Sequence, residues 1–154
     1  MLIKVQRHER RTRIVEYMIK LKADDKDNDL EVWEWFASIL GHLGPDGMSS
    51  DESSVEGVET VYRVKRLPWR REVAGCMDII DGQRHKDSDI FATQGTKPIK
   101  RVRGTANPQS TRTAVRQLPR PFYDDDWFDG LNANRQSTLD ISDEAFEWYN
   151  VTTV

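Results

Sequence analysis

The pattern of hydrophobic and polar positions predicts a basic helix over residues 2–22. Apolar side chains recur there at the three- and four-residue spacing of one helical face, at Ile14, Val15, Met18 and Ile19. Four arginines crowd the first half of this segment. The polar run at residues 23–27 has no such periodicity, so we expect the helix to end there.

A second helix is expected between Asp29 and Gly44. Asn28 or Asp29 can cap its first turn, and Gly44 opens a strong turn signal that stops it. The apolar stripe on this segment comprises Leu30, Trp33, Ala37, Leu40 and Leu43, and it is widened by Val32, Trp35, Phe36 and Ile39. Such a stripe needs a partner surface, and the first helix is the nearest one. We therefore predict an antiparallel helical hairpin over residues 1–44.

The remainder of the chain is predicted to form four segments. Residues 45–60 are an acidic, serine-rich linker by composition, and residues 61–91 hold a strand followed by a helix. Residues 92–121 are a basic, proline-containing segment that is extended or disordered. Residues 122–154 are an acidic segment with a turn or short helix at its start and a last short helix capped by Ser142. The fold class is thus mainly α with one short β element.

Composition limits what this fold can bury. Of the 154 residues, 32% are charged and only 35 are Leu, Ile, Val or Phe, close to the composition of disordered chains. No apolar run approaches the length of a membrane span, and the start of the chain lacks a secretion signal. The single cysteine, Cys76, fits a reducing compartment. We expect a protein of the nucleus or cytoplasm with a thin core and no membrane partner.

Charge is strongly segregated along the chain, although the total is only −3. Six blocks alternate in sign: +5 over residues 1–22, −10 over 24–60, +5 over 62–71, −3 over 72–96, +7 over 97–120 and −7 over 121–154. Each block presents its own field, so the total says little about partners. The blocks can also neutralise one another within the chain.

Signals for metal binding or catalysis are weak. The side chains of His8, His42, Cys76 and His85 have no spacing that is typical of a zinc site. The acidic run Asp124–Gly130 fails the pattern of a calcium loop in both possible registers. There is no nucleophile elbow, phosphate loop or dinucleotide fingerprint. We expect no metal, no cofactor and no catalytic residue.

Basic residues interleaved with aromatic ones are the strongest functional signal. In residues 62–71, phosphate contacts are predicted for Arg63, Lys65, Arg66, Arg70 and Arg71, and base stacking for Tyr62 and Trp69. Residues 97–120 contribute seven bases and no acid, with Lys100, Arg101 and Arg103 as further contacts. The open alternative for Trp69 is that it closes the core beside Leu67.

These signals predict a non-enzymatic nuclear protein that contacts DNA or RNA. The alternative is a protein-interaction or scaffold module. In that module, blocks of opposite charge pair between chains, by self-association or with another protein. The helix with Trp33, Trp35 and Phe36 then docks into a partner groove.

Two short motifs suggest regulation. Residues Lys97, Lys100, Arg101 and Arg103 match a short nuclear-import pattern. Ser49, Ser50 and Ser53 precede acidic residues, as the target sites of acid-directed kinases do. Their phosphates would add negative charge beside the basic block of residues 62–71. The alternative is that this stretch is only a solvated linker.

Three ordered phrases resemble a family of uncharacterised proteins that occur in many copies in mushroom-forming fungi. They are GPDGMSSDES at residues 44–53, VYRVKRLPWR at 61–70 and LPRPFY at 118–123. The resemblance covers about residues 30–150, and the copy number of the family implies a link to mobile elements. Family members are often longer at the N-terminus, which implies that Met1 begins a shortened copy. The resemblance implies no activity and no site residue.

Overall fold

The structure is a computed structural model that describes residues 2–25, 29–49, 51–56, 59–86, 101–102, 107, 109–110 and 112–149. The chain forms two compact units, each assembled from separate stretches of sequence. Unit 1 comprises residues 1–46, 72–95 and 147–154, and unit 2 comprises residues 47–71 and 96–146. The predicted hairpin of residues 1–44 lies wholly within unit 1. The predicted segment 61–91 does not stay together, because it is divided between the units at residue 72.

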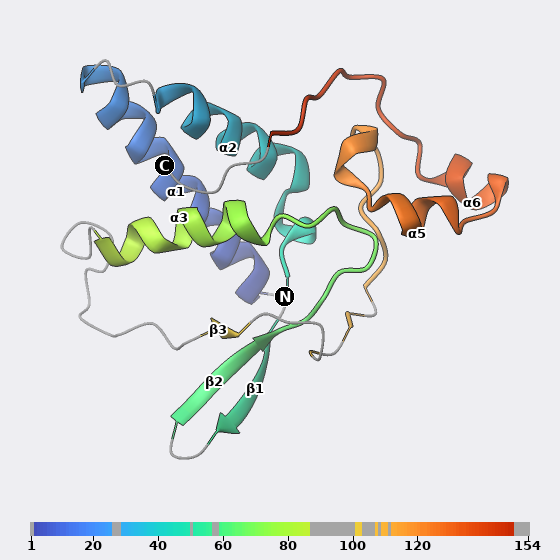
Figure 1. The fold of residues 1–154 in the computed structure, drawn as a ribbon, viewed down its shortest axis with the longest axis horizontal. Coiled ribbons are helices and arrows are strands. Elements are labelled where there is room, and N and C mark those ends of the chain that lie inside the picture. Colours follow the sequence, from blue (N-terminus) through green and yellow to red (C-terminus); the bar gives the residue numbers. More distant parts are fainter. Residues whose placement is uncertain are drawn as a thin grey trace. The chain divides into compact units, whose positions relative to one another are not determined.

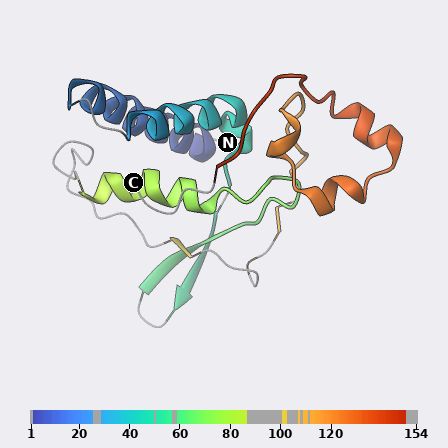
Figure 2. The same ribbon diagram turned by 45° about the horizontal axis from the view of Figure 1, so that its top comes forward.

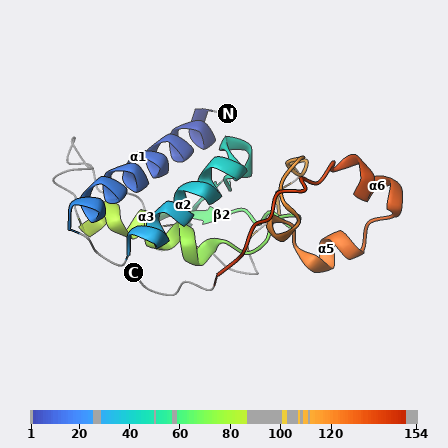
Figure 3. The ribbon, with the colours of Figure 1, turned by 90° about the horizontal axis from the view of Figure 1, so that it is seen from above.

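The described part of unit 1 is helical. Helix α1 spans Leu2–Asp25, α2 spans Leu30–Leu43 and α3 spans Ala74–Lys86. Helices α1 and α2 lie side by side as an antiparallel hairpin, and α3 packs against α1 (Figures 1 and 3). The predicted hairpin is therefore confirmed, and so is the helix predicted after the strand. None of the described helices is both long and apolar enough to cross a membrane.

The predicted apolar stripes form the core of unit 1. Helix α1 buries Ile14, Val15 and Met18, α2 buries Trp33, Phe36, Ile39, Leu40 and Leu43, and α3 buries Cys76, Met77 and Ile80. The Trp33 and Phe36 rings meet edge to face at 5.2 Å. Because Trp33 and Phe36 are buried between the helices, the prediction that this helix offers them to a partner groove is wrong.

An ion pair between a buried arginine and a half-buried aspartate joins α1 to α3. The Arg11 side chain is almost completely buried, and its Nε and Nη2 donate to the two carboxylate oxygens of Asp81 at 2.9 and 2.8 Å. This two-point geometry matches the planar guanidinium to the carboxylate and gives the strongest kind of side-chain hydrogen bond. The pair thus fixes how α3 sits on the hairpin.

The end of the described chain also packs on unit 1, without forming a helix. The Trp35 ring meets the rings of Trp148 and Tyr149 edge to face at 5.4 and 5.5 Å, and its Nε1 donates to the Glu147 carbonyl at 3.2 Å. The helix predicted after Ser142 is therefore wrong. Trp148 and Tyr149 contact α2 in a segment without helical structure, whereas Phe146 packs on the Phe122 ring in unit 2 at 4.6 Å. The Ser142 hydroxyl accepts from the Glu144 N–H in a local turn.

The described part of unit 2 contains a small sheet. Strand β1 (Asp51–Glu56) pairs antiparallel with β2 (Glu59–Val64), and β3 (Arg101–Val102) lies parallel to the other side of β2 (Figure 2). The mainly helical fold class with one small β element is confirmed. The acidic stretch of residues 45–60 is not a linker throughout, because β2 offers an open edge and the segment before it pairs with that edge.

Two short helices complete the described part of unit 2, α5 (Asp125–Asp129) and α6 (Ala133–Thr138). Short 3₁₀ turns form at Arg120–Phe122 in unit 2 and at Pro45–Gly47, where the chain passes from unit 1 to unit 2. The helices have capped N-termini. The Asp124 side chain accepts from the Trp127 N–H, and the Asn132 side chain accepts from the Arg135 N–H, both at 2.9 Å. These caps satisfy backbone donors that a helix start leaves open.

The core of unit 2 forms where two distant stretches run side by side. The Arg71 N–H donates to the Phe122 carbonyl at 2.8 Å, and the Asp124 N–H donates to the Trp69 carbonyl at 2.9 Å. The side chains buried around this pairing are Val61, Val64, Leu67, Trp69, Leu118, Phe122, Tyr123 and Leu139. As predicted, residues 112–118 form neither helix nor strand.

Candidate nucleic-acid interface

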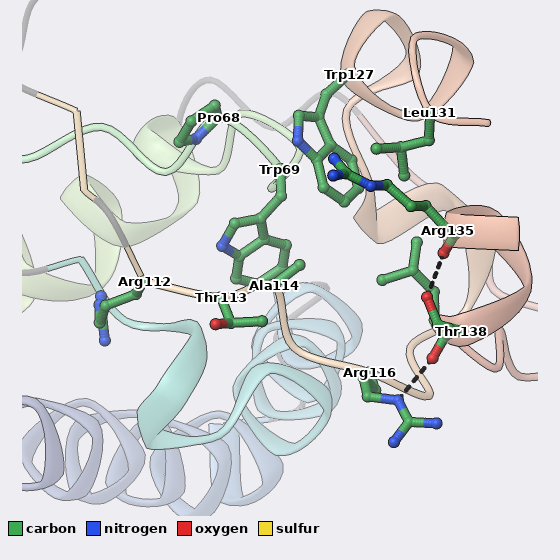
Figure 4. Close-up of a pocket in the computed structure, with 11 residues that line it drawn as sticks. Pro68, Trp69, Arg112, Thr113, Ala114, Arg116, Trp127, Leu131, Arg135 and Thr138 are labelled. Carbon is green, nitrogen blue, oxygen red and sulfur yellow. Dashed lines mark hydrogen bonds between the residues drawn. The ribbon is translucent and has the colours of Figure 1, made fainter.

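An open pocket in unit 2 brings together arginine and tryptophan side chains. Its volume is about 560 Å³, which lies in the range of ligand-binding sites. Figure 4 shows its lining, which includes Arg112, Arg116, Arg135, Trp69 and Trp127, with an apolar floor of Pro68, Leu131 and Leu139. Its described lining contains no Asp or Glu. We call it the arginine–tryptophan pocket, and its lining carries three positive charges.

Arg116 and Arg135 present charge that the described protein does not neutralise. The Arg116 Nε donates to the Thr138 carbonyl at 2.7 Å, and the Thr138 hydroxyl donates to the Arg135 carbonyl at 2.6 Å (Figure 4). The first bond ties the irregular segment of residues 112–118 to α6, and the second lies within α6. Both arginines are exposed. Within the described residues, neither the terminal nitrogens of Arg116 nor the guanidinium of Arg135 has a hydrogen bond or ion pair.

Arg112 has a different role from these two arginines. One of its terminal nitrogens donates to the Met48 carbonyl, and its Nε donates to the Ser110 hydroxyl at 3.4 Å. It is half-buried. Arg112 therefore holds two stretches of unit 2 together, and it contributes positive charge to the pocket rather than an accessible guanidinium.

The ring of Trp127 lies nearly parallel to the ring of Tyr123. The two rings are nearly parallel, with an angle of 15° and centroids 6.2 Å apart. Tyr123 is buried, and its hydroxyl donates to the Val115 carbonyl at 2.7 Å. Burial raises the pKa of the Tyr123 hydroxyl, so it stays protonated and keeps donating. Trp127 itself is only half-buried, which makes it a fixed aromatic wall of the pocket.

The nearby acidic residues have other partners. The Asp124 carboxylate caps α5, Asp125 pairs with Arg120 at 3.1 Å, and Asp140 accepts from Gln117 at 3.1 Å. The positive charge of Arg120 is therefore neutralised within the chain by Asp125. The Arg120 guanidinium also lies over the Phe128 ring, 4.1 Å from its centroid. Among the described residues, no Asp or Glu side chain forms an ion pair with Arg116 or Arg135.

The residues of the block 62–71 that were predicted to bind nucleic acid differ in exposure and in hydrogen-bond partners. Tyr62, Arg63 and Lys65 are half-buried, and Arg66 is exposed. An Arg63 terminal nitrogen and the Arg66 Nε donate to the side-chain and backbone oxygens of Asn107, at 3.5 and 3.1 Å. These four residues remain candidates, as does the half-buried Arg71.

The structure contradicts the stacking role predicted for Trp69, and it gives Arg70 hydrogen bonds within unit 2. Trp69 is only 2% exposed, so it cannot stack on a base and instead closes the core near Leu67. Arg70 is a structural residue: its terminal nitrogens donate to the Gly47 carbonyl at 2.6 Å and to the Ser49 hydroxyl at 3.0 Å. The sequence did not indicate these contacts of Trp69 and Arg70, because both side chains contact stretches that are distant in sequence.

The structure describes only some of the residues predicted for phosphorylation and nuclear import. Ser49 is buried and its hydroxyl binds Arg70, so its prediction as a phosphorylation site is wrong for the folded protein. Ser53 lies in β1, with its backbone paired opposite Tyr62. The backbone of Arg101 forms β3. The remaining candidates, Ser50, Lys97, Lys100 and Arg103, lie outside the described residues.

No family model, curated protein or solved structure matches the chain. Function must therefore be argued from the geometry of the site. Among the described residues, no group of three or more His, Cys, Asp or Glu side chains is arranged to hold a metal ion. The Cys76 thiol is buried in unit 1, and burial raises its pKa to about 11, so little of the reactive thiolate forms near neutral pH.

Sequence reasoning missed Arg135 and Trp127. The acidic composition of residues 121–154 hid both, since Trp127 lies in a run of aspartates. One signal was present, because Arg135 is the single basic residue in that block. An isolated positive charge in an acidic segment suggests a specific contact, either within the fold or with a ligand.

Proposed function

We propose that the protein is a non-enzymatic module that binds nucleic acid through the arginine–tryptophan pocket. The observation that supports this is the pair of exposed guanidinium groups, Arg116 and Arg135, beside the aromatic wall of Trp127. Guanidinium groups match phosphate oxygens in a planar, two-point geometry. Aromatic rings next to such charges are typical of surfaces that bind exposed bases.

The chemistry of the lining favours binding over catalysis. Arginine cannot accept a proton near neutral pH. The described lining contains no His, Cys, Asp or Glu, and its hydroxyl groups belong to Thr113 and Thr138. A general base within reach of a bound substrate is therefore lacking among these residues. Such a pocket suits recognition of an anion.

Charge around the pocket favours nucleic acid over a short acidic peptide. Unit 2 holds 13 basic and 11 acidic residues, whereas unit 1 holds 10 basic and 15 acidic ones. The chain runs from Arg63, Lys65 and Arg66 directly into Pro68 and Trp69, which line the pocket. The basic residues thus adjoin the pocket along the chain, and contact with several phosphates of a nucleic-acid backbone needs more than one ligand group.

A salt titration tests this proposal. Binding of labelled DNA and RNA oligonucleotides, measured by fluorescence anisotropy, should weaken steeply as NaCl increases. Replacing Arg116 and Arg135 together by Gln should lower the affinity at least about 10-fold. It should also reduce the slope of log affinity against log salt by roughly 1.4 for single strands, since each phosphate contact contributes about 0.7.

The matched control removes two charges elsewhere. Arg13 and Lys20 are exposed on α1 in unit 1, so replacing both by Gln should change affinity and slope little. Absence of binding at low salt would overturn the proposal. Equal losses in the two double variants would also overturn it, because binding would then follow net charge alone. Capture of an acidic peptide without nucleic acid would replace it by peptide recognition.

We also propose that residues 97–103 direct the protein to the nucleus. A short basic cluster in an extended chain suits the acidic groove of an import receptor. A fusion too large for passive diffusion should accumulate in nuclei, and replacing Lys100, Arg101 and Arg103 by Ala should shift it to the cytoplasm. Unchanged nuclear signal in that variant would contradict this. Membership of the fungal family stays a prediction, and a transposase frame beside the gene would favour a mobile-element origin.

A further inference from the structure

We propose that the arginine–tryptophan pocket takes one unstacked base of a single strand. The face of that base lies on Trp127, and its neighbouring phosphates contact Arg116 and Arg135. This inference rests on the proposed function and adds to it a preference for single strands over duplexes. It follows from the shape and chemistry of the pocket.

The aromatic wall is already in position for stacking. The Tyr123 ring is stacked parallel to the Trp127 ring, and the Tyr123 hydroxyl donates to the Val115 carbonyl. Asp124 fixes the backbone of Trp127 by accepting from its N–H. A ring held in this way loses little freedom on binding, which favours affinity. In this inference, the base stacks on the Trp127 face that Tyr123 leaves open.

The rest of the pocket fits a flat, partly apolar group. Pro68, Leu131 and Leu139 supply apolar surface, and the buried Trp69 forms part of the floor. A volume of about 560 Å³ is ample for a base with its sugar. In a duplex both faces of a base are covered by its neighbours, so only an unpaired, unstacked base can occupy a concave aromatic site.

The two arginines give the pocket its charge and its direction. The Nε of Arg116 is bonded to Thr138, so the stem is held while the terminal nitrogens remain available to a phosphate. Arg135 extends from α6, a different element, and is exposed. Two cations from separate elements beside one ring suit consecutive phosphates of a strand that passes over the pocket.

Replacement of Trp127 by Leu tests the inference. Stacking on one aromatic residue contributes about 5- to 150-fold in affinity, so single-strand binding should fall within that range while duplex binding changes little. Trp127→Phe keeps a ring and should retain most of the affinity. Phe128→Leu is the matched control, because Phe128 belongs to α5 but does not line the pocket. Circular dichroism confirms that each variant is folded.

A spectroscopic measurement on the unmutated protein keeps the test independent of variant stability. The indole N–H signal of Trp127, assigned from Trp127→Phe, should shift upfield when a short oligothymidylate or oligouridylate is added, because a stacked base shields it. Salt-dependent binding with an unmoved Trp127 signal would overturn the inference. So would equal affinity for single strands and duplexes. After either of these two results, nucleic-acid binding by the pocket would still be supported if the Arg116 and Arg135 double variant loses binding. Absence of binding by every oligonucleotide removes both.

Discussion

Replacing Asp81 by Asn is expected to lower the free energy of unfolding by about 3 kcal/mol, because removing one member of a buried ion pair is strongly destabilising. The Arg11 side chain is only 1% exposed, and it bonds both oxygens of the Asp81 carboxylate. Asparagine keeps the size of the side chain but removes the charge and the matching second acceptor. Urea unfolding followed by far-UV circular dichroism measures the loss.

Two further variants isolate the cause. Glu16 is exposed on the same helix, α1, so Glu16→Gln should change stability by less than about 0.5 kcal/mol. A double variant, Arg11→Met with Asp81→Leu, should recover at least half of the loss, because an apolar pair of similar volume can replace a buried ion pair. If Asp81→Asn were as mild as Glu16→Gln, the pair would not fix α3 on the hairpin.

The helical hairpin was predictable because its information is local. The apolar stripes of residues 2–22 and 30–43 show one face each, and only a short connection separates the two helices. Their partner surface is therefore the neighbouring element, and α1 and α2 form within a few residues of the expected bounds. Helix α3 was predictable for the same reason, although Arg11, which anchors it, gave no sign of that role.

Unit 2 was less predictable because its contacts join distant stretches. Composition marked residues 45–60 as a linker, but β1 forms there because β2 supplies the other half of its hydrogen bonds. Phe146 and Tyr149, with Trp148 beside them, suggested a helix after Ser142. Instead, Trp148 and Tyr149 pack on Trp35, more than a hundred positions earlier, and Phe146 packs on Phe122. Periodicity within a window does not contain such information.

The residue types of the candidate site were predictable from the sequence, but the particular residues that form it were not. Sequence reasoning expected arginine beside tryptophan, and the structure has that combination with different members. Trp69, which was expected at the surface, is buried in unit 2, and the half-buried Arg70 donates to Gly47 and Ser49 within that unit. Trp127 and Arg135, which lay hidden in an acidic block, line the open pocket. Residue types carry the chemistry, but only the packing decides which side chains remain accessible.

Arg70 tests this distinction between structural and binding arginines. Replacing it by Gln should lower the free energy of unfolding by about 3 kcal/mol, since it removes two hydrogen bonds from a charged donor that each contribute roughly 1.5–3 kcal/mol. The acceptors it leaves are the Gly47 carbonyl and the hydroxyl of Ser49, which is only 3% exposed. Tryptophan fluorescence, to which the buried Trp69 contributes, can follow the unfolding.

The exposed Arg66 provides the matched comparison. Arg66→Gln should change stability by less than about 1 kcal/mol but weaken nucleic-acid binding, because its guanidinium is at the surface next to Asn107. Arg70→Gln should show the reverse: a large loss of stability, and near-normal affinity at temperatures where the variant is folded. If Arg70→Gln were stable but bound as weakly as the Arg116 and Arg135 double variant, Arg70 would be a phosphate contact, and its bonds to Gly47 and Ser49 would not be its main role.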